Sequence, residues 1–148
     1  MVMTMAMDAS RLRVSPVFEG LTDEELERSA ALFEEVELLA GSSLIKEGDF
    51  SYRFFVVLDG EVDVTHDFDP VRRLGPGEIC GEIGLLTGQR RTARVVAHTR
   101  CKLASLITWD FRTLMEQAPA AARKIEAIAE ERIAANETTA ANPDADAS

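Results

Sequence analysis

Apolar positions near the start of the chain follow the spacing of a helix. Leu26, Ala30 and Phe33 recur three and four positions apart, which predicts an amphipathic helix over residues 23–35. The four residues 22–25, Thr-Asp-Glu-Glu, form a capping box, in which the threonine hydroxyl and the final glutamate satisfy amides of the first turn. The sequence therefore predicts that this helix begins directly after Thr22.

After residue 35 the apolar runs become short and are separated by glycine, proline and aspartate about every ten positions. The runs are Val36–Ala40, Leu44-Ile45, Phe54–Leu58, Val62–Val64, Val71–Leu74, Thr92–Ala97 and Cys101–Ile107. Short strands at this spacing predict an all-β roll, barrel or sandwich.

Helical spacing returns at the C-terminal end of the chain. Phe111, Leu114 and Met115 predict one short helix. Pro119, which a first helical turn tolerates, precedes an alanine-rich amphipathic helix over residues 120–135. We expect that removing residues 119–135 would leave a folded β-core.

The length of 148 residues, with 46% apolar and 28% charged, suits one globular domain. We expect this domain at residues 16–135, after a flexible lead-in at 1–15 and before a disordered acidic tail at 136–148. No apolar run approaches the roughly 20 residues that cross a bilayer, and the first residues do not form a signal-peptide pattern. Membrane insertion is not expected, and a cytoplasmic location is the simplest interpretation. Two cysteines, Cys80 and Cys101, lack CxxC spacing and indicate free thiols. Cys80 is expected to be buried.

Charge is distributed unevenly along the chain. The net charge is −10, yet residues 71–112 hold 8 of the 16 Lys and Arg residues and 3 of the 26 Asp and Glu residues. The overall charge argues against nucleic acid or an anionic membrane as the main partner. The basic middle segment could receive a small anion, or its arginines could form an ordinary solvated face.

The segment GEIGLLTGQRRTARV, residues 81–95, combines glycines, one carboxylate and paired arginines. A single helical turn at 82–87 would point unpaired amides in one direction, which favours an anion. Gly81 and Gly84 would allow close approach, and a following arginine could clamp the same anion. Glu82 would repel phosphate but would accept a hydrogen bond from a sugar hydroxyl. An anion and a hydroxyl-bearing ring side by side describe a nucleotide.

This segment resembles the phosphate-binding cassette of cyclic nucleotide-binding domains. The family pattern is Gly-Glu-aliphatic-small-Leu-aliphatic, a short spacer, then Arg-Thr/Ala-Ala, and the chain supplies Gly81–Leu86 and Arg91-Thr92-Ala93. The resemblance covers about residues 17–135. It implies a mainly β fold: an eight-stranded antiparallel β-roll, or double-stranded β-helix, with an N-terminal helix, a short cassette helix and two C-terminal helices.

The resemblance also implies how the cassette binds its ligand. Glu82 would accept the ribose 2′-hydroxyl, and Arg91 would pair with the cyclic phosphate. Amides around Ile83 and Gly84, and those after Arg91 at Thr92 and Ala93, would complete the phosphate cradle beside Gly81. The Thr92 hydroxyl could donate to the phosphate or to a guanine, or could satisfy a local backbone group.

Four further residues match positions around the base. Val64 and Leu74 match strand positions that form an apolar wall, and Arg132 and Ile133 match positions on the last helix that fold over the base as a lid. Arg132 could equally face water, as arginines on terminal helices often do. Trp109 is expected to pack against the protein and not to stack on the ligand.

An enzyme is not expected, because His66 and His98 are isolated and no nucleophile motif is present. The sequence predicts a stand-alone sensor for cyclic AMP, with cyclic GMP as the second candidate and no metal or other cofactor. Two alternatives remain. One is a regulatory module of, or acting in trans on, a channel, transporter or signalling enzyme, with an effector protein as partner. The other is a degenerate interaction scaffold. A DNA-binding regulator is disfavoured, since no reading helix is recognised after residue 135, and the oligomeric state is not predicted.

Overall fold

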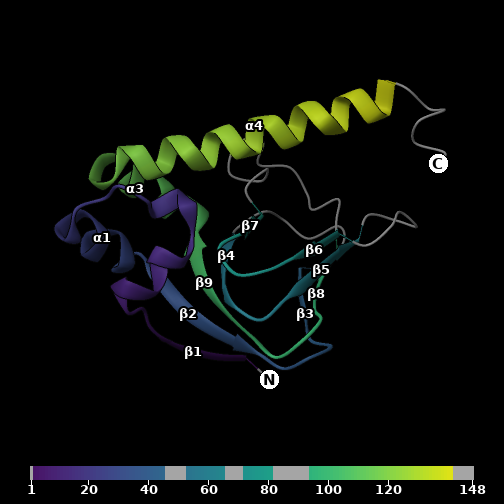
Figure 1. The fold of residues 1–148 in the computed structure, drawn as a ribbon, viewed down its shortest axis with the longest axis horizontal. Coiled ribbons are helices and arrows are strands. Elements are labelled where there is room, and N and C mark those ends of the chain that lie inside the picture. Colours follow the sequence, from purple (N-terminus) through teal and green to yellow (C-terminus); the bar gives the residue numbers. More distant parts are fainter. Residues whose placement is uncertain (1, 46–52, 66–71, 82–93, 142–148) are drawn as a thin grey trace.

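The computed structural model describes residues 2–45, 53–65, 72–81 and 94–141 (Figure 1). Its strands are β1 (Val2–Ala6), β2 (Phe33–Leu38), β3 (Ser43–Ile45), β4 (Arg53–Asp59), β5 (Val62–Thr65), β6 (Arg72–Leu74), β7 (Ile79–Cys80), β8 (Arg94–Ala97) and β9 (Cys101–Ile107). Its helices are the 3-10 segments η1 (Ala9–Val14), η2 (Pro16–Phe18) and η3 (Thr108–Asp110), and the α-helices α1 (Asp23–Ala30), α3 (Phe111–Gln117) and α4 (Pro119–Ala141).

The strands form two antiparallel sheets, which confirms the predicted β-roll. The five-stranded sheet has the order β1-β2-β9-β4-β7, and the four-stranded sheet has the order β3-β8-β5-β6. The longest pairings join β9 to β2 and to β4, for example Val36 opposite Leu103 and Val56 opposite Ala104. The described residues hold nine strands where eight were expected, and the predicted cassette helix lies outside them.

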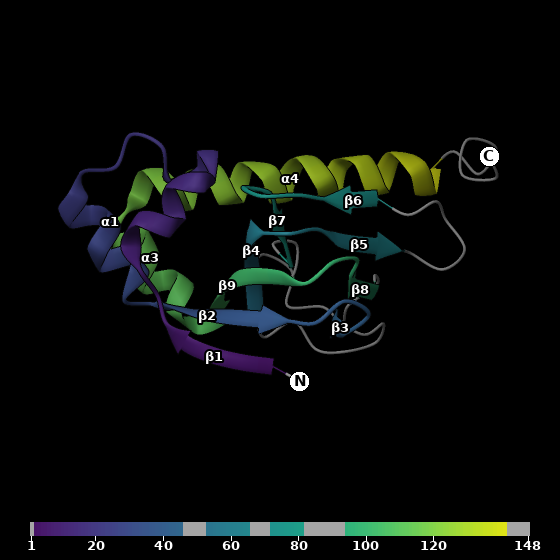
Figure 2. The same ribbon diagram turned by 60° about the horizontal axis from the view of Figure 1, so that its bottom comes forward.

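The first fifteen residues differ from the flexible lead-in that we expected. β1 pairs with β2 from Val2 opposite Leu38 to Ala6 opposite Glu34, at the edge of the larger sheet (Figure 2). In η1, Leu12 is fully buried, and an ion pair 3.3 Å long joins Arg11 to Glu35 of β2. The segment is ordered because an edge of the sheet is available to it, a feature that local sequence does not reveal.

Helix α1 starts as predicted and ends early. The Glu25 amide donates to the Thr22 hydroxyl and the Thr22 amide donates to the Glu25 carboxylate, both at 3.1 Å, which confirms the capping box. The helix ends at Ala30 instead of residue 35, and Phe33 begins β2. Six pairs with β9 hold this segment as a strand, so tertiary pairing overrides the apparent helical spacing.

Helix α4 extends to Ala141, beyond the predicted end at residue 135. Residues 136–141, expected to be disordered, continue the helix, and 142–148 lie outside the described residues. The extension contains alanine, a strong helix former, and no glycine or proline before Pro143.

The buried side chains form two clusters, one on each face of the larger sheet. The helix-side core lies between this sheet and the helices and includes Phe18, Leu106, Leu114 and Ile125. The roll interior lies between the two sheets and includes Val57, Leu74 and Cys80. Three residues of α4 are almost fully buried in the helix-side core: Ala121, Ala122 and Ile125. Removing residues 119–135 would therefore expose part of the helix-side core, and the expectation that a folded β-core would remain stays a prediction.

Candidate functional site

A groove of about 1010 Å³ runs between α4, the N-terminal segment and the β6–β7 turn. The residues that line it are Pro16, Val17, Glu19, Arg72, Arg73, Leu74, Pro76, Gly77, Glu78, Ile79, Lys124, Ala127, Ile128, Glu131 and Arg132. Both views show α4 passing over β6 and β7 (Figures 1 and 2). Of the residues predicted from sequence, Leu74 and Arg132 thus line one groove, although 58 positions separate them along the chain.

Arg132 connects α4 to β7. Its Nη1 donates a hydrogen bond of 2.8 Å to the backbone carbonyl of Ile79, and the contact is partly buried. Arg132 is half-buried and does not point freely into water. The alternative that this arginine only faces solvent is therefore wrong.

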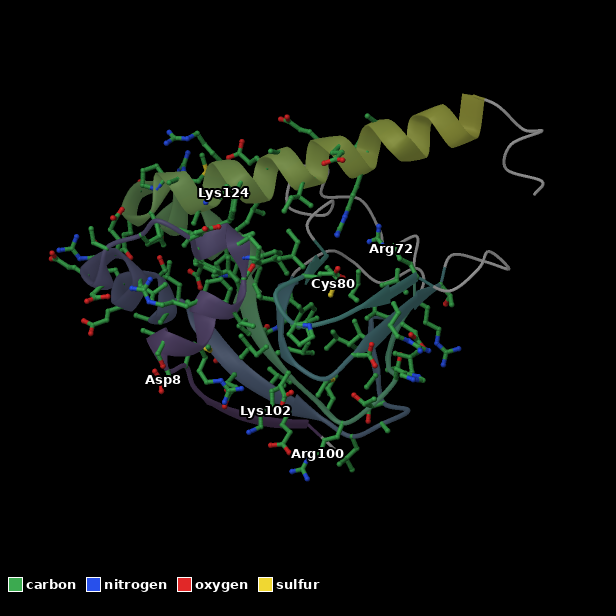
Figure 3. The ribbon with its side chains drawn as sticks, in the orientation of Figure 1. Asp8, Arg72, Cys80, Arg100, Lys102 and Lys124 are labelled. Carbon is green, nitrogen blue, oxygen red and sulfur yellow. The ribbon has the colours of Figure 1, made fainter. Side chains whose placement is uncertain are left out.

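Lys124 connects the same helix to the N-terminal segment. Its Nζ donates to the carbonyl of Pro16, the first residue of η2, at 3.2 Å, and to that of Glu19, just after η2, at 3.0 Å. Figure 3 shows Lys124 on α4 beside this segment. Because Lys124, Ile128 and Arg132 are four residues apart, they share one face of the helix.

The two predicted wall residues occupy the smaller sheet. Leu74 is 3% exposed in the roll interior and lies opposite Val62. Val64 is half-buried, packs against the roll interior and lies between Arg72 of β6 and Val95 of β8. Ile133 is also half-buried, but neither it nor Val64 lines the groove.

Gly81 is the first residue of the cassette pattern, and the structure describes it. Its φ of +86° lies in the left-handed region, which glycine adopts without strain. Glu82, Ile83, Gly84, Arg91, Thr92 and Ala93 lie outside the described residues, so their assigned roles stay predictions. The described part shows where the chain enters the cassette: at the end of β7, beside the groove.

Sequence analysis did not identify Gly77 as a determinant of this region. Its φ is +91°, and a Cβ placed there would lie 2.6 Å from the Val14 carbonyl oxygen. The buried Ser15 hydroxyl donates to the Gly77 carbonyl at 2.7 Å. The β6–β7 turn thus packs directly on the N-terminal segment. The Gly-Pro-Gly sequence at residues 75–77 signalled a turn, but not this contact.

Arg73, which lines the groove, forms an ion pair with Asp63. Its Nε and Nη2 donate to the two carboxylate oxygens of Asp63, at 2.7 and 3.2 Å. The hydrogen bonds from Arg73 hold the pKa of the Asp63 carboxyl below its usual value, and Asp63 in turn raises the pKa of Arg73. His98 Nδ1 lies 3.2 Å from Arg73 Nη2 and joins this cluster.

The remaining predictions concern Cys80, Cys101 and Trp109. Both cysteines are buried free thiols, which confirms the burial predicted for Cys80, and burial raises the pKa of Cys101 to about 11. Figure 3 shows Cys80 on β7. Trp109 is 68% exposed, so the expectation that it packs against the protein is wrong. Within the described ranges no cluster of three or more potential metal ligands occurs, and none of the helices is long and apolar enough to span a bilayer.

Known proteins match this chain over most of its length. A sequence model of the cyclic nucleotide-binding domain matches residues 35–118. The cyclic AMP receptor protein of Thermus thermophilus is 30% identical over 127 residues, which are 82% of this chain and 59% of that protein. A cyclic nucleotide-gated potassium channel of Rhizobium etli is 36% identical over 110 residues, which are 70% of this chain and 31% of the channel.

The fold agrees with these sequence matches. The crystal structure of the Thermus thermophilus catabolite activator protein aligns with a TM-score of 0.72 and 29% identity, and the alignment covers 84% of this chain and 61% of that one. The chain thus spans less than two thirds of each of these relatives. Matching sequence over more than half of its length, on the same roll, places the chain in the cyclic nucleotide-binding domain family.

Proposed function

We propose that the chain is a sensor that binds a cyclic nucleotide, with cyclic AMP as the first candidate and cyclic GMP as the second. The observation that carries this proposal is the position of Gly81. At Gly81 the chain leaves β7 and enters the cassette sequence, beside the groove that Leu74 and Arg132 line. A ligand held by the cassette would therefore lie between the roll and α4.

In this proposal, Arg91 and the cassette amides neutralise the cyclic phosphate, and Glu82 accepts a hydrogen bond from the ribose 2′-hydroxyl. Hydrogen bonds to a charged group contribute about 1.5–3 kcal/mol each. Val64 and Leu74 supply apolar contact to the base, and Ile133 covers it from α4. The order of these residues along the chain and the family match support the assignment.

The bound state would be signalled through α3 and α4. The ligand raises the population of the form in which α4 closes over the base only as far as it binds that form more tightly than the open one. The names of the relatives, a receptor protein and a gated channel, support a regulatory role. This role would be that of a free-standing sensor, or of a module acting on a channel, transporter or signalling enzyme through an effector contact, and not that of a catalyst.

The test compares two adjacent arginines by calorimetric titration with cyclic AMP. We expect Arg91→Ala to weaken binding at least tenfold, because it removes a charge-assisted bond to the phosphate. Arg90→Ala is the matched control and should change affinity less than threefold. Equal effects of the two substitutions would contradict the assigned phosphate site.

A second measurement separates a sensor from an interaction scaffold. Cyclic AMP at millimolar concentration should raise the melting temperature of the unmodified protein, because a ligand that binds only the folded state stabilises it. If neither cyclic AMP nor cyclic GMP changes the melting temperature, the scaffold alternative is favoured.

A further inference from the structure

The larger sheet ends at β1, and this edge differs from the other sheet edges that the structure describes. Proteins protect edge strands by making them short, charged or irregular, or by covering them. β7 has two residues and lies under α4, β6 has two arginines among its three residues, and β3 has three residues in an irregular register. β1 has five residues, none of which is charged, glycine or proline. It is thus the longest and least protected of these edges.

One side of β1 is open to a further strand. Within the described ranges β1 pairs with β2 alone, from Val2 opposite Leu38 to Ala6 opposite Glu34. Both ribbon views place β1 on the opposite side of the molecule from α4 (Figures 1 and 2). A strand added to β1 would therefore continue the larger sheet away from the helices.

The sequence of β1 fits an antiparallel copy of itself. It reads Val-Met-Thr-Met-Ala, so a copy centred on Thr4 sets Thr4 opposite Thr4, Met3 opposite Met5 and Val2 opposite Ala6. Threonine pairs across neighbouring strands are favourable, and no charge meets a like charge in this register. A second copy of this chain, related by a two-fold axis at Thr4, is therefore an occupant that suits this edge.

The charges on the next strand do not oppose this pairing. β2 carries three carboxylates, and each is in an ion pair with an arginine of the same chain: Glu34 with Arg53, Glu35 with Arg11, and Glu37 with Arg100. In the paired state the two uncharged β1 strands would separate these carboxylates from those of the second copy. Repulsion across the junction is therefore small.

We propose that the outer edge of β1 is an interaction surface for a second copy of this chain. Antiparallel pairing of the two β1 strands joins the two larger sheets into one continuous sheet, and main-chain hydrogen bonds supply the contact. No residue of β1 lines the groove under α4, so the pairing leaves that groove accessible. The interface is thus separate from the proposed cyclic nucleotide site, and a failure to bind cyclic nucleotides would leave its test unaffected.

The first experiment uses the unmodified protein. Sedimentation over concentrations of roughly 1 µM to 1 mM should show a monomer–dimer equilibrium, and a monomer throughout would overturn the proposal. Amide hydrogen exchange at the two ends of this range locates the contact. The amides of β1 that point away from β2 should exchange at least about tenfold more slowly in the dimer. A dimer in which these amides stay unprotected would also overturn the proposal.

The second experiment tests the two-fold register. Thr4→Lys and Thr4→Glu each set like charges opposite one another, so each variant alone should have a dimer dissociation constant raised about five- to tenfold. An equal mixture sets lysine opposite glutamate and should restore association. Met115→Lys adds a charge to an exposed apolar residue of α3 and should leave the constant within about twofold. A mixture that associates no better than either variant alone would overturn the proposal.

Discussion

The two halves of α4 are attached to the protein in different ways. The first half places Ala121, Ala122 and Ile125 against the helix-side core, each 2% exposed or less. The second half lies beside the roll (Figure 1). There Arg132 donates a hydrogen bond to a backbone carbonyl of β7. One half of the helix is thus a structural part of the core, and the other is held to the roll through polar contact.

This difference matters because the two kinds of attachment respond differently to a ligand. The stabilisation that comes from buried apolar surface is roughly proportional to the area buried. It is lost only when the core is exposed. A hydrogen bond is directional, contributes about 0.5–3 kcal/mol, and can be exchanged for another partner. We therefore expect the first half of α4 to stay docked while the second half changes its position when a ligand binds.

The largest effect is expected from truncating a buried side chain in the first half. Ile125→Ala leaves a cavity in the helix-side core and should lower the free energy of unfolding by about 2–5 kcal/mol in urea titrations. Ile133→Ala, on the half-buried part of the second half, should cost less than about 1 kcal/mol. If the two substitutions cost the same, the distinction between the halves is wrong.

A smaller effect is expected from the turn that faces the second half across the groove. Gly77→Ala would place a Cβ 2.6 Å from the Val14 carbonyl oxygen at a φ of +91°, and should cost about 1–3 kcal/mol. Gly75→Ala is the control, because a Cβ there meets no atom within 4 Å. Thermal unfolding of both variants measures the difference. Equal melting temperatures would show that the turn does not depend on its contact with the N-terminal segment.

The smallest effect concerns the ion pair at the groove edge. The pKa of Asp63 lies below its usual 3.8 because Arg73 donates hydrogen bonds to it. The ion pair therefore stabilises the folded state at pH values above 3.8. This contribution disappears as the pH falls through the lowered pKa. Carboxyl NMR titration should show the Asp63 pKa rising in Arg73→Ala, with little change in stability near neutral pH, since the pair is exposed. An unchanged Asp63 pKa in this variant would contradict the prediction.

The local features of the fold could be derived from the sequence because each is encoded within a few residues. The capping box at Thr22, the strand that begins at Cys101 and the proline start of α4 all appear where the residues predicted them. The cassette pattern in the sequence likewise pointed to the family. It did so because the glycines, the carboxylate and the arginine of the family pattern stand in a fixed order within a few residues.

Contacts between distant segments were not derivable in this way. Helical spacing at Phe33 gave no sign that pairing with β9 would make this residue a strand, and the apolar start of the chain gave no sign that it would complete a sheet edge. The bond from Ser15 to Gly77 spans 62 positions and the bond from Arg132 to Ile79 spans 53. Both end on backbone carbonyls, which every residue carries, so no side-chain pattern marks them.

The sequence by itself thus determined the type of most elements between residues 22 and 135, the order of the cassette and the membership of the family, because short-range propensities and motif chemistry are local. Only the tertiary structure decided which half of α4 belongs to the core, which carbonyl receives Arg132 and which glycine supports the groove. These depend on how the sheet edges and the helix meet in space, and that arrangement is set by the packing of the whole chain.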